Sequence, residues 1–136
     1  MASMRSMGRE RCLELLASVP VGRVVFSMRA LPAIRPVNHL VDGNTVVIRS
    51  NLGGSLASAA TQSGAVVVAY EADTFDLDAR TGWTVVVTGA ARLILDADRQ
   101  ARYERLLRPW VDEPMNCVIG IDCDLVTGYE LAPLTA

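Results

Sequence analysis

The stretch NTVVIRSNLGGSLASAA, residues 44–60, places a cation and two hydroxyl groups around a glycine turn. Its pattern predicts a strand that ends at Arg49 and Ser50. A double-glycine turn at residues 53–54 then leads into a helix that begins at Ser55. The first N–H groups of a helix are unpaired and carry partial positive charge, so such a corner can hold an anion. Arg49 offers a forked, charged donor, and the two serine hydroxyls can complete the coordination of a phosphate.

A second interpretation of the same corner is purely structural. Ser55 can cap the helix with its hydroxyl, and Arg49 can be a solvated charge at the end of a strand. Residue types and spacing alone leave both interpretations open.

No other group of residues has the spacing of a catalytic or metal site. His39 is the only histidine, and without a nucleophile motif or a second ligand it forms neither a triad nor a metal cluster. An acidic loop is expected at residues 73–80, and the nearby carboxylates lack the spacing of an acid/base pair or a calcium loop. We expect them to be solvated or paired with Arg80. These carboxylates are Glu71, Asp73, Asp76 and Asp78.

The three cysteines, Cys12, Cys117 and Cys123, are expected in the core. An odd number suits a reducing compartment. Cys117 and Cys123 lie in one expected strand, where six residues separate them by roughly 20 Å, far beyond the reach of a disulfide. With no CxxC pair and one histidine, no metal site is expected.

The charge balance excludes several classes of partner. The net charge is −2, and all 13 basic residues are arginine, with no basic cluster that would indicate a nucleic-acid or membrane partner. The sequence shows no signal peptide and no apolar run of membrane-spanning length, so we expect a cytoplasmic protein. Its length fits one domain, expected at residues 9–136 after a flexible N-terminus at residues 1–8.

The composition also predicts that the protein associates with a second copy of itself. Hydrophobic residues make up 51% of the chain and charged residues 21%, which is apolar for so small a protein. Because monomers rarely expose large apolar patches, we expect part of this surface to lie in the interface of a homodimer.

Extended segments dominate the pattern. Short helices are expected at residues 9–17, 56–61 and 96–108. Turn signals separate the remaining segments, and no strand is followed by the long helix that a parallel sheet requires. The pattern therefore predicts a mainly β fold, an antiparallel barrel of six or seven strands with short flanking helices. The expected strands are residues 22–27, 31–41, 45–50, 64–72, 81–95, 117–125 and 126–131, with a bend at Gly89.

Three segments in order carry a family resemblance: RPVNH at residues 35–39, VVIRSNLGGSLASA at residues 46–59, and RTGWTVVVTGAARLI at residues 80–94. Together they resemble the pyridoxamine 5′-phosphate oxidase-like proteins of the FMN-binding split-barrel superfamily. The resemblance runs from Arg9 to about Leu131 and is closest to a small single-domain type common in actinobacteria. It implies a split-barrel homodimer with two flavin sites, each formed by both subunits.

The resemblance also implies where the cofactor binds. It puts the phosphate at the corner of Arg49, Ser50 and Ser55, in agreement with the anion seat. Many relatives carry a lysine, in a G-x-K pattern, where this chain has Ser55, and the loss of that contact weakens phosphate binding by about 1.5–3 kcal/mol. The whole implied cofactor site is Arg35, Pro36, Val37, Asn38, Val47, Ile48, Arg49, Ser50, Ser55 and Trp83.

The flavin ring is expected along the strand that carries RPVNH, with main-chain groups of residues 47–48 opposite. Strand alternation places Arg35 and Val37 on one face. Pro36 and Asn38 lie on the other, so only one set is expected to face the flavin. The resemblance favours Asn38 as a polar contact to the ring edge, with Arg35 near the site.

Trp83 is implied as an aromatic wall that reaches over from the second subunit, a role that suits its planar, amphipathic ring. Simple packing within its own barrel is the alternative.

The function implied by the resemblance is that of an FMN-dependent oxidoreductase acting on an unidentified small molecule. In such an enzyme the flavin carries the redox chemistry, which fits a chain so poor in catalytic residue patterns. Two alternatives stay open. One is a deazaflavin-dependent reductase, and the other is a non-catalytic flavin- or ligand-binding module, which the serine at position 55 favours.

Overall fold

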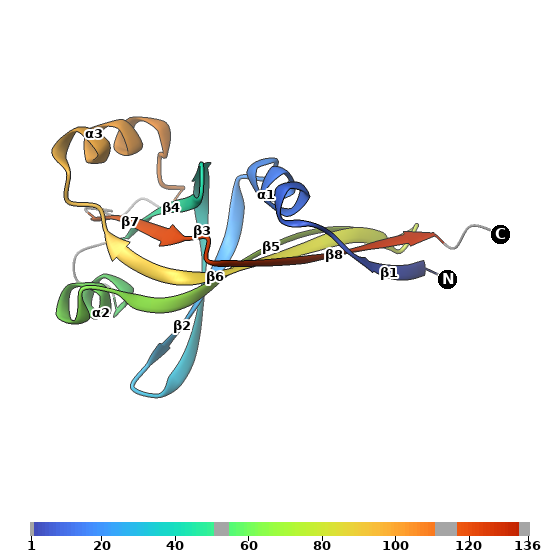
Figure 1. Ribbon diagram of the computed structural model, residues 1–136, viewed down its shortest axis with the longest axis horizontal. Coiled ribbons are helices and arrows are strands. Elements are labelled where there is room, and N and C mark those ends of the chain that lie inside the picture. Colours follow the sequence, from blue (N-terminus) through green and yellow to red (C-terminus); the bar gives the residue numbers. More distant parts are fainter. Residues whose placement is uncertain (1, 51–54, 111–116, 134–136) are drawn as a thin grey trace.

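The computed structural model describes residues 2–50, 55–110 and 117–133 (Figure 1). It is built mainly from antiparallel strands, with three short helices at the edges of the sheet. The helices are α1 (Arg9–Ala17), α2 (Ser55–Ser63) and α3 (Ala97–Leu106). The strands are β1 (Ala2–Ser6), β2 (Val21–Met28), β3 (Leu31–Asp42), β4 (Thr45–Ser50), β5 (Val66–Asp76), β6 (Thr81–Leu93), β7 (Cys117–Asp122) and β8 (Leu125–Pro133).

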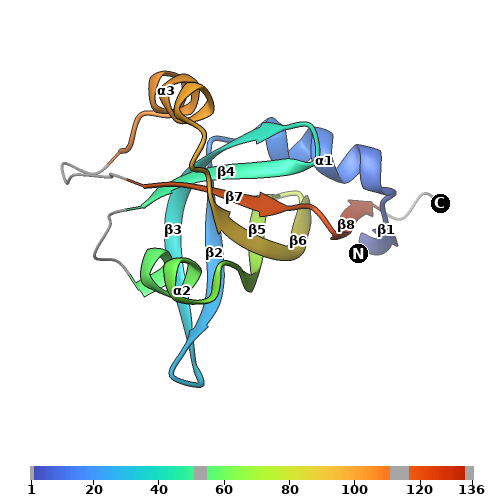
Figure 2. The ribbon, with the colours of Figure 1, turned by 60° about the vertical axis from the view of Figure 1, so that its left-hand side comes forward.

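Six of the strands close a barrel in the order β6-β5-β2-β3-β4-β7, and a pairing between β6 and β7 completes the ring (Figure 2). Strands β8 and β1 extend the sheet beyond the barrel, because β8 pairs with an earlier part of the same β6 edge that β7 joins. The predicted antiparallel barrel with short flanking helices is confirmed. Among the described residues, no helix is long and apolar enough to cross a bilayer.

Strand β6 changes its neighbour at Gly89. It pairs with β8 over residues 82–88 and with β7 over residues 91–93. A Cβ atom on Gly89 would lie 1.7 Å from the carbonyl oxygen of Asp122, so the close approach of the chain at this point requires a glycine. The bend predicted at this residue is the place where the barrel and the extension of the sheet separate.

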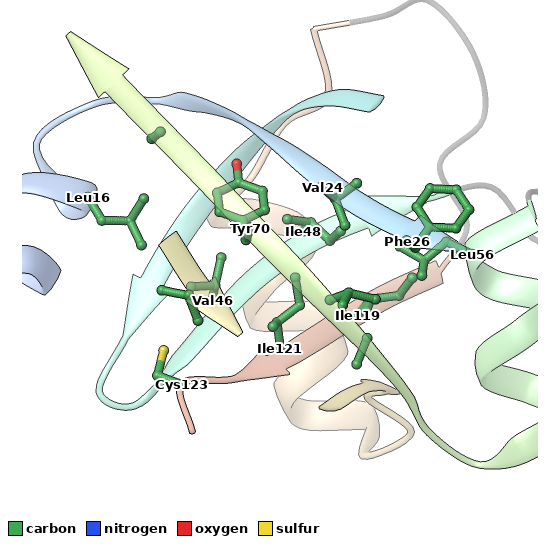
Figure 3. Close-up of a cluster of buried hydrophobic side chains, with 14 of the residues drawn as sticks. Leu16, Val24, Phe26, Val46, Ile48, Leu56, Tyr70, Ile119, Ile121 and Cys123 are labelled. Carbon is green, nitrogen blue, oxygen red and sulfur yellow. The ribbon is translucent and has the colours of Figure 1, made fainter. Parts of the chain in front are cut away.

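Strand β4 lies between two hydrophobic clusters because its side chains alternate between two faces. Val46 and Ile48 point into the barrel, where they meet Ile119 and Ile121 of β7 (Figure 3). Val47 points outward and packs beneath α3 in a second cluster, completed by Ile94, Tyr103, Leu107 and Val118. Full burial of one such side chain stabilises the fold by about 1.5–3 kcal/mol.

The helices begin and end close to the predicted positions. α1 spans the predicted residues 9–17 and buries Cys12 and Leu16, while α2 buries one face against the barrel. α3 is capped by Asp96, whose carboxylate accepts a hydrogen bond from Arg99 N at 2.9 Å. All three cysteines are free and buried, as predicted.

Two segments differ from the prediction. Residues 1–8 were expected to be flexible, but Ala2–Ser6 forms β1, in register with the exposed edge of β8. Residues 73–76 were expected in an acidic loop, but β5 continues to Asp76 because β6 pairs with it along its whole length. Pairing with a neighbouring strand makes both segments extended, although neither has a local sequence signal for a strand.

Candidate functional site

The barrel opens between β3 and β4. These strands pair only from His39 opposite Ile48 to Asp42 opposite Thr45. The earlier part of β3, residues 31–38, pairs with β2 alone. The two strands therefore diverge at His39, and one edge of β3 is left facing the gap.

A cleft of about 220 Å³ occupies this gap. Its volume is below the roughly 300–1,000 Å³ typical of small-molecule sites. The walls are mainly apolar, with one amide and one guanidinium among them. The lining residues are Val21, Pro36, Val37, Asn38, Arg49, Pro109 and Trp110.

Main-chain groups of Asn38 face the cleft. His39 N–H donates to the carbonyl of Pro20 at 3.0 Å, on the β2 side of the strand. Because main-chain groups alternate sides along a strand, the N–H and C=O of Asn38 point the opposite way, toward β4. The cleft thus has a main-chain donor and acceptor beside apolar walls, which suits the polar edge of a planar ring.

The side chains of Asn38 and Arg49 bind two consecutive carbonyls that follow α3. Asn38 Nδ2 donates to Arg108 O at 2.8 Å, and Arg49 Nη1 donates to Leu107 O at 3.1 Å. We call residues 107–110 the post-α3 segment. Its attachment to β3 and β4 places Pro109 and Trp110 against the cleft.

The predicted phosphate corner is only partly described. β4 ends at Ser50 and α2 begins at Ser55, but the turn at residues 53–54 and the Ser55 side chain lie outside what the structure describes. Strand alternation puts the Arg49 and Ser50 side chains on opposite faces of β4. A phosphate that contacts both must therefore sit beyond the end of the strand, where the chain turns toward α2.

The residues predicted to contact the flavin ring fall into two groups: some line the cleft and others do not. Pro36, Val37 and Asn38 all line the cleft. Both faces of β3 thus contribute to the cleft, and the expectation that only one of them faces the flavin stays a prediction. Arg35 is exposed and its Nη1 donates to the carbonyl of Ile34 at 3.0 Å.

Val47 and Ile48 are fully buried, one in each hydrophobic cluster, and their strand is paired with a neighbour on both sides. Trp83 lies on β6, opposite Thr74 of β5, and is half-buried against the main core. It is not among the residues that line the cleft of its own chain.

His39 is buried and holds three elements together. Its Nε2 lies 2.8 Å from Leu16 O at the end of α1, and its Nδ1 lies 2.6 Å from the Tyr70 hydroxyl on β5. That hydroxyl also donates to Val37 O at 3.0 Å. Burial lowers the pKa of His39, and the bond to Leu16 opposes this with a smaller effect. Burial likewise raises the pKa of Tyr70, so the phenol stays protonated. The His39 ring thus links β3, the strand that lines the cleft, to α1 and β5.

The carboxylates of β5 pair with an arginine that the sequence did not indicate. Arg23 Nη1 lies 2.9 Å from Glu71 and 3.4 Å from Asp73, so the expected pairing with Arg80 is wrong for these two. Burial, followed by the neighbouring Asp73, raises the pKa of Glu71, while Arg23 lowers it. Asp76 accepts hydrogen bonds from main-chain N–H groups in the turn after β5.

Sequence reasoning missed the post-α3 segment and Tyr70. In the sequence, Pro109 indicates only the end of the helix expected at residues 96–108, and Trp110 has no neighbouring motif. Tyr70 lies within a continuous apolar run, where an aromatic residue has the appearance of ordinary core. The contacts of these residues join positions 31 to 70 residues apart, so no local spacing could have indicated them.

Comparison with known proteins now decides the family. The sequence matches the pyridoxamine 5′-phosphate oxidase family over residues 8–129, nearly the whole described fold. The chain belongs to this family. Its membership agrees with the antiparallel barrel of the structure, and it confirms the resemblance seen in the sequence.

Relatives within and around the pyridoxamine 5′-phosphate oxidase family are similar over almost their full lengths. An uncharacterised protein of Mycobacterium tuberculosis is 50% identical over 127 residues, covering 92% of this chain and 84% of its own. The structure of an FAD-binding protein from Mycobacterium smegmatis is 29% identical, with a TM-score of 0.73, and covers 96% of this chain and 97% of its own. A putative pyridoxamine 5′-phosphate oxidase from Corynebacterium glutamicum is also 29% identical, with a TM-score of 0.79 and coverages of 94% and 98%.

Proposed function

We propose that this protein binds a flavin in the cleft between β3 and β4 and acts as an FMN-dependent oxidoreductase on a small molecule. The observation that carries the proposal is the combination of an outward-facing main chain at Asn38 with the Arg49 guanidinium across an apolar slot. A flavin has the matching parts: a planar ring with polar atoms along one edge, and an anionic phosphate.

The residues fit such a cofactor. Pro36, Val37 and Val21 offer apolar surface to the ring, and the Asn38 main chain can bond its edge. Arg49 lies at the end of β4, and α2 is the next element along the chain. In the proposed site its guanidinium binds a phosphate that also contacts the first N–H groups of the helix. The bound flavin would supply the electron-transfer chemistry, while these residues hold and orient it and keep water from its face.

FAD is the second candidate cofactor. Its support comes from the FAD-binding protein of Mycobacterium smegmatis, whose sequence is 29% identical over nearly the whole chain. FAD and FMN share the ring and the first phosphate, so the same cleft and the same arginine serve both. The adenosine part of FAD would have to extend beyond the cleft.

A second copy of the chain is the proposed partner. An outer row of side chains crosses five strands in register, from Ile34 of β3 to Leu125 of β8, through Val25, Ala69 and Thr88. The two ends of this row are 57% and 59% exposed. Four of the five side chains are apolar, and a monomer would leave this surface in water. A homodimer that covers it would also complete a cleft too small for a whole flavin.

The test is an absorbance titration of purified protein with FMN, FAD and a deazaflavin, each followed by ultrafiltration. We expect one FMN or FAD retained per chain, with the visible spectrum of an oxidised flavin. NADH or NADPH would then be added without oxygen, and bleaching of the flavin bands would support an oxidoreductase. Retention of no flavin would overturn the proposal, and a retained flavin that no donor reduces would favour the binding-module alternative.

A further inference from the structure

Trp110 is the most exposed aromatic side chain in the cleft. It is 71% exposed and directly follows Pro109, which also lines the cleft. Exposure of a large indole costs hydrophobic free energy that burial would recover. Pro36 and Val37 of β3 line the same cleft and also present apolar surface to it.

The position of Trp110 is fixed by the chain that precedes it. Leu107 is buried in the second hydrophobic cluster, and its N–H donates to Tyr103 O at 2.8 Å. The carbonyls of Leu107 and Arg108 accept the bonds from Arg49 and Asn38 described above. Two strands and one helix thus hold the post-α3 segment in place up to Arg108, two residues before Trp110.

Tyr103, one turn before this segment in α3, adds a further attachment to β3. Its hydroxyl donates to Asp42 Oδ2 at 2.7 Å, at the far end of β3. The guanidinium of Arg102 lies 3.5 Å from the same carboxylate oxygen. α3 is therefore held to β3 at one end and the post-α3 segment to Asn38 at the other, which keeps the segment alongside the cleft strand.

We propose that Trp110 is a further ligand-binding residue, an aromatic platform that stacks on the face of the ring bound in the cleft. The inference rests on the proposed flavin site. The ring then lies between the indole and the apolar wall of β3, while the main chain at Asn38 meets its edge. Stacking of a flat ligand on an indole favours planar aromatic ligands and does not depend on the phosphate.

Four variants test this role. Trp110→Ala removes the platform, and Trp110→Phe keeps a smaller one. Leu106→Ala is the matched control, because Leu106 is 57% exposed at the end of α3 and does not line this cleft. Trp83→Phe leaves Trp110 as the only tryptophan in the chain.

Dissociation constants for FMN and for riboflavin, which lacks the phosphate, would be measured from flavin fluorescence. We expect Trp110→Ala to weaken both ligands by about tenfold, the equivalent of about 1.4 kcal/mol. Trp110→Phe is expected to recover most of the loss, and Leu106→Ala to bind like the wild type. Equal affinity of Trp110→Ala and wild type would overturn the platform while leaving the flavin site intact. Failure of the wild type to bind any flavin would instead refute the proposed function.

A second readout separates contact from a structural effect. In Trp83→Phe, the fluorescence lifetime of Trp110 would be measured with increasing acrylamide, with and without saturating riboflavin. We expect strong quenching in the free protein and at least threefold weaker quenching in the complex, because the ring covers the indole. Unchanged quenching in the complex would place Trp110 outside the ligand contact and overturn the inference.

Discussion

His39 Nδ1 and the Tyr70 hydroxyl oxygen lie 2.6 Å apart in the buried space between β3 and β5. The carbonyl of Leu16 can only accept, so Nε2 of the ring must carry a proton. In a neutral ring Nδ1 is then an acceptor, and the single phenolic proton is shared between Nδ1 and Val37 O. A protonated ring would satisfy all three contacts, but burial opposes the charge.

The first prediction concerns the charge of this ring. Because burial lowers the pKa of His39 below its ordinary 6.5, we expect a neutral ring with the proton on Nε2 at pH 7. A neutral ring favoured in the folded state stabilises the protein above pH 6.5, and this contribution is lost as the pH falls through the lower folded-state pKa. The measurement is a nitrogen-15 NMR titration, in which the only histidine needs no assignment.

Thermal unfolding between pH 5 and pH 8 provides the matching control. The wild type should lose more stability below pH 6.5 than His39→Asn, since the variant has no ring to protonate. A ring that titrates above 6.5, or identical pH profiles for the two proteins, would contradict the prediction.

Tyr70→Phe removes the shared proton, so His39 Nδ1 and Val37 O both lose this hydrogen-bond donor. We expect the free energy of unfolding to fall by about 1–3 kcal/mol, the cost of an unpaired buried polar group. Denaturant unfolding measures the loss. Tyr129→Phe is the matched control, since Tyr129 is 43% exposed and should tolerate the change. Similar stabilities for the two variants would mean that the Tyr70 hydroxyl has no structural role.

Arg49→Ala should reduce the affinity for FMN by at least tenfold, because it removes a charge-assisted bond to the phosphate. Loss of the bond to Leu107 O lowers the free energy of unfolding by about 1 kcal/mol, so the barrel stays folded. Flavin titration and circular dichroism check the two parts. Arg92→Ala changes the net charge equally at an exposed pair with Asp122 and should leave binding unchanged. Equal FMN affinity in Arg49→Ala and wild type would remove Arg49 from the site.

Trp83→Ala tests the aromatic wall expected from the second subunit. If the indole crosses the interface, truncation should weaken both the dimer and the flavin complex by about tenfold, as for an interface hot spot. Sedimentation over a range of concentrations and flavin titration give the two values. Leu77→Ala, at an 86% exposed side chain, is the control. A tight dimer with normal flavin affinity would show that Trp83 only packs within its own barrel.

The elements of the barrel were predictable because their signals are local. The turn signal at residues 42–44 and the apolar run that follows it predict β4 with its observed bounds, and Asp96 is a typical cap for the start of α3. The turn between β2 and β3 was less predictable. Arg29 and Ala30 form a two-residue loop in which both residues adopt positive φ, of 53° and 63°, as in a type I′ hairpin turn. Such a turn usually requires glycine or asparagine, so its geometry could not be inferred from these residues.

The site was predictable only along β3. Pro36, Val37 and Asn38 follow from the family resemblance to one segment, and the structure brings them to one cleft. The attachment of the post-α3 segment was not predictable. It depends on hydrogen bonds across 58 and 70 residues, and their acceptors are main-chain carbonyls, which carry no sequence signal.

The change of neighbour along β6 divides the molecule into two units of stability. Closure of the barrel uses residues 91–93, whereas β8 is bound only to residues 82–88 on the other side of Gly89. The ribbon of β1 and β8 can therefore separate from β6 without opening the ring that carries the cleft. We expect its amide protons to exchange with solvent through this local opening, and those of β7 to exchange only when the barrel itself unfolds.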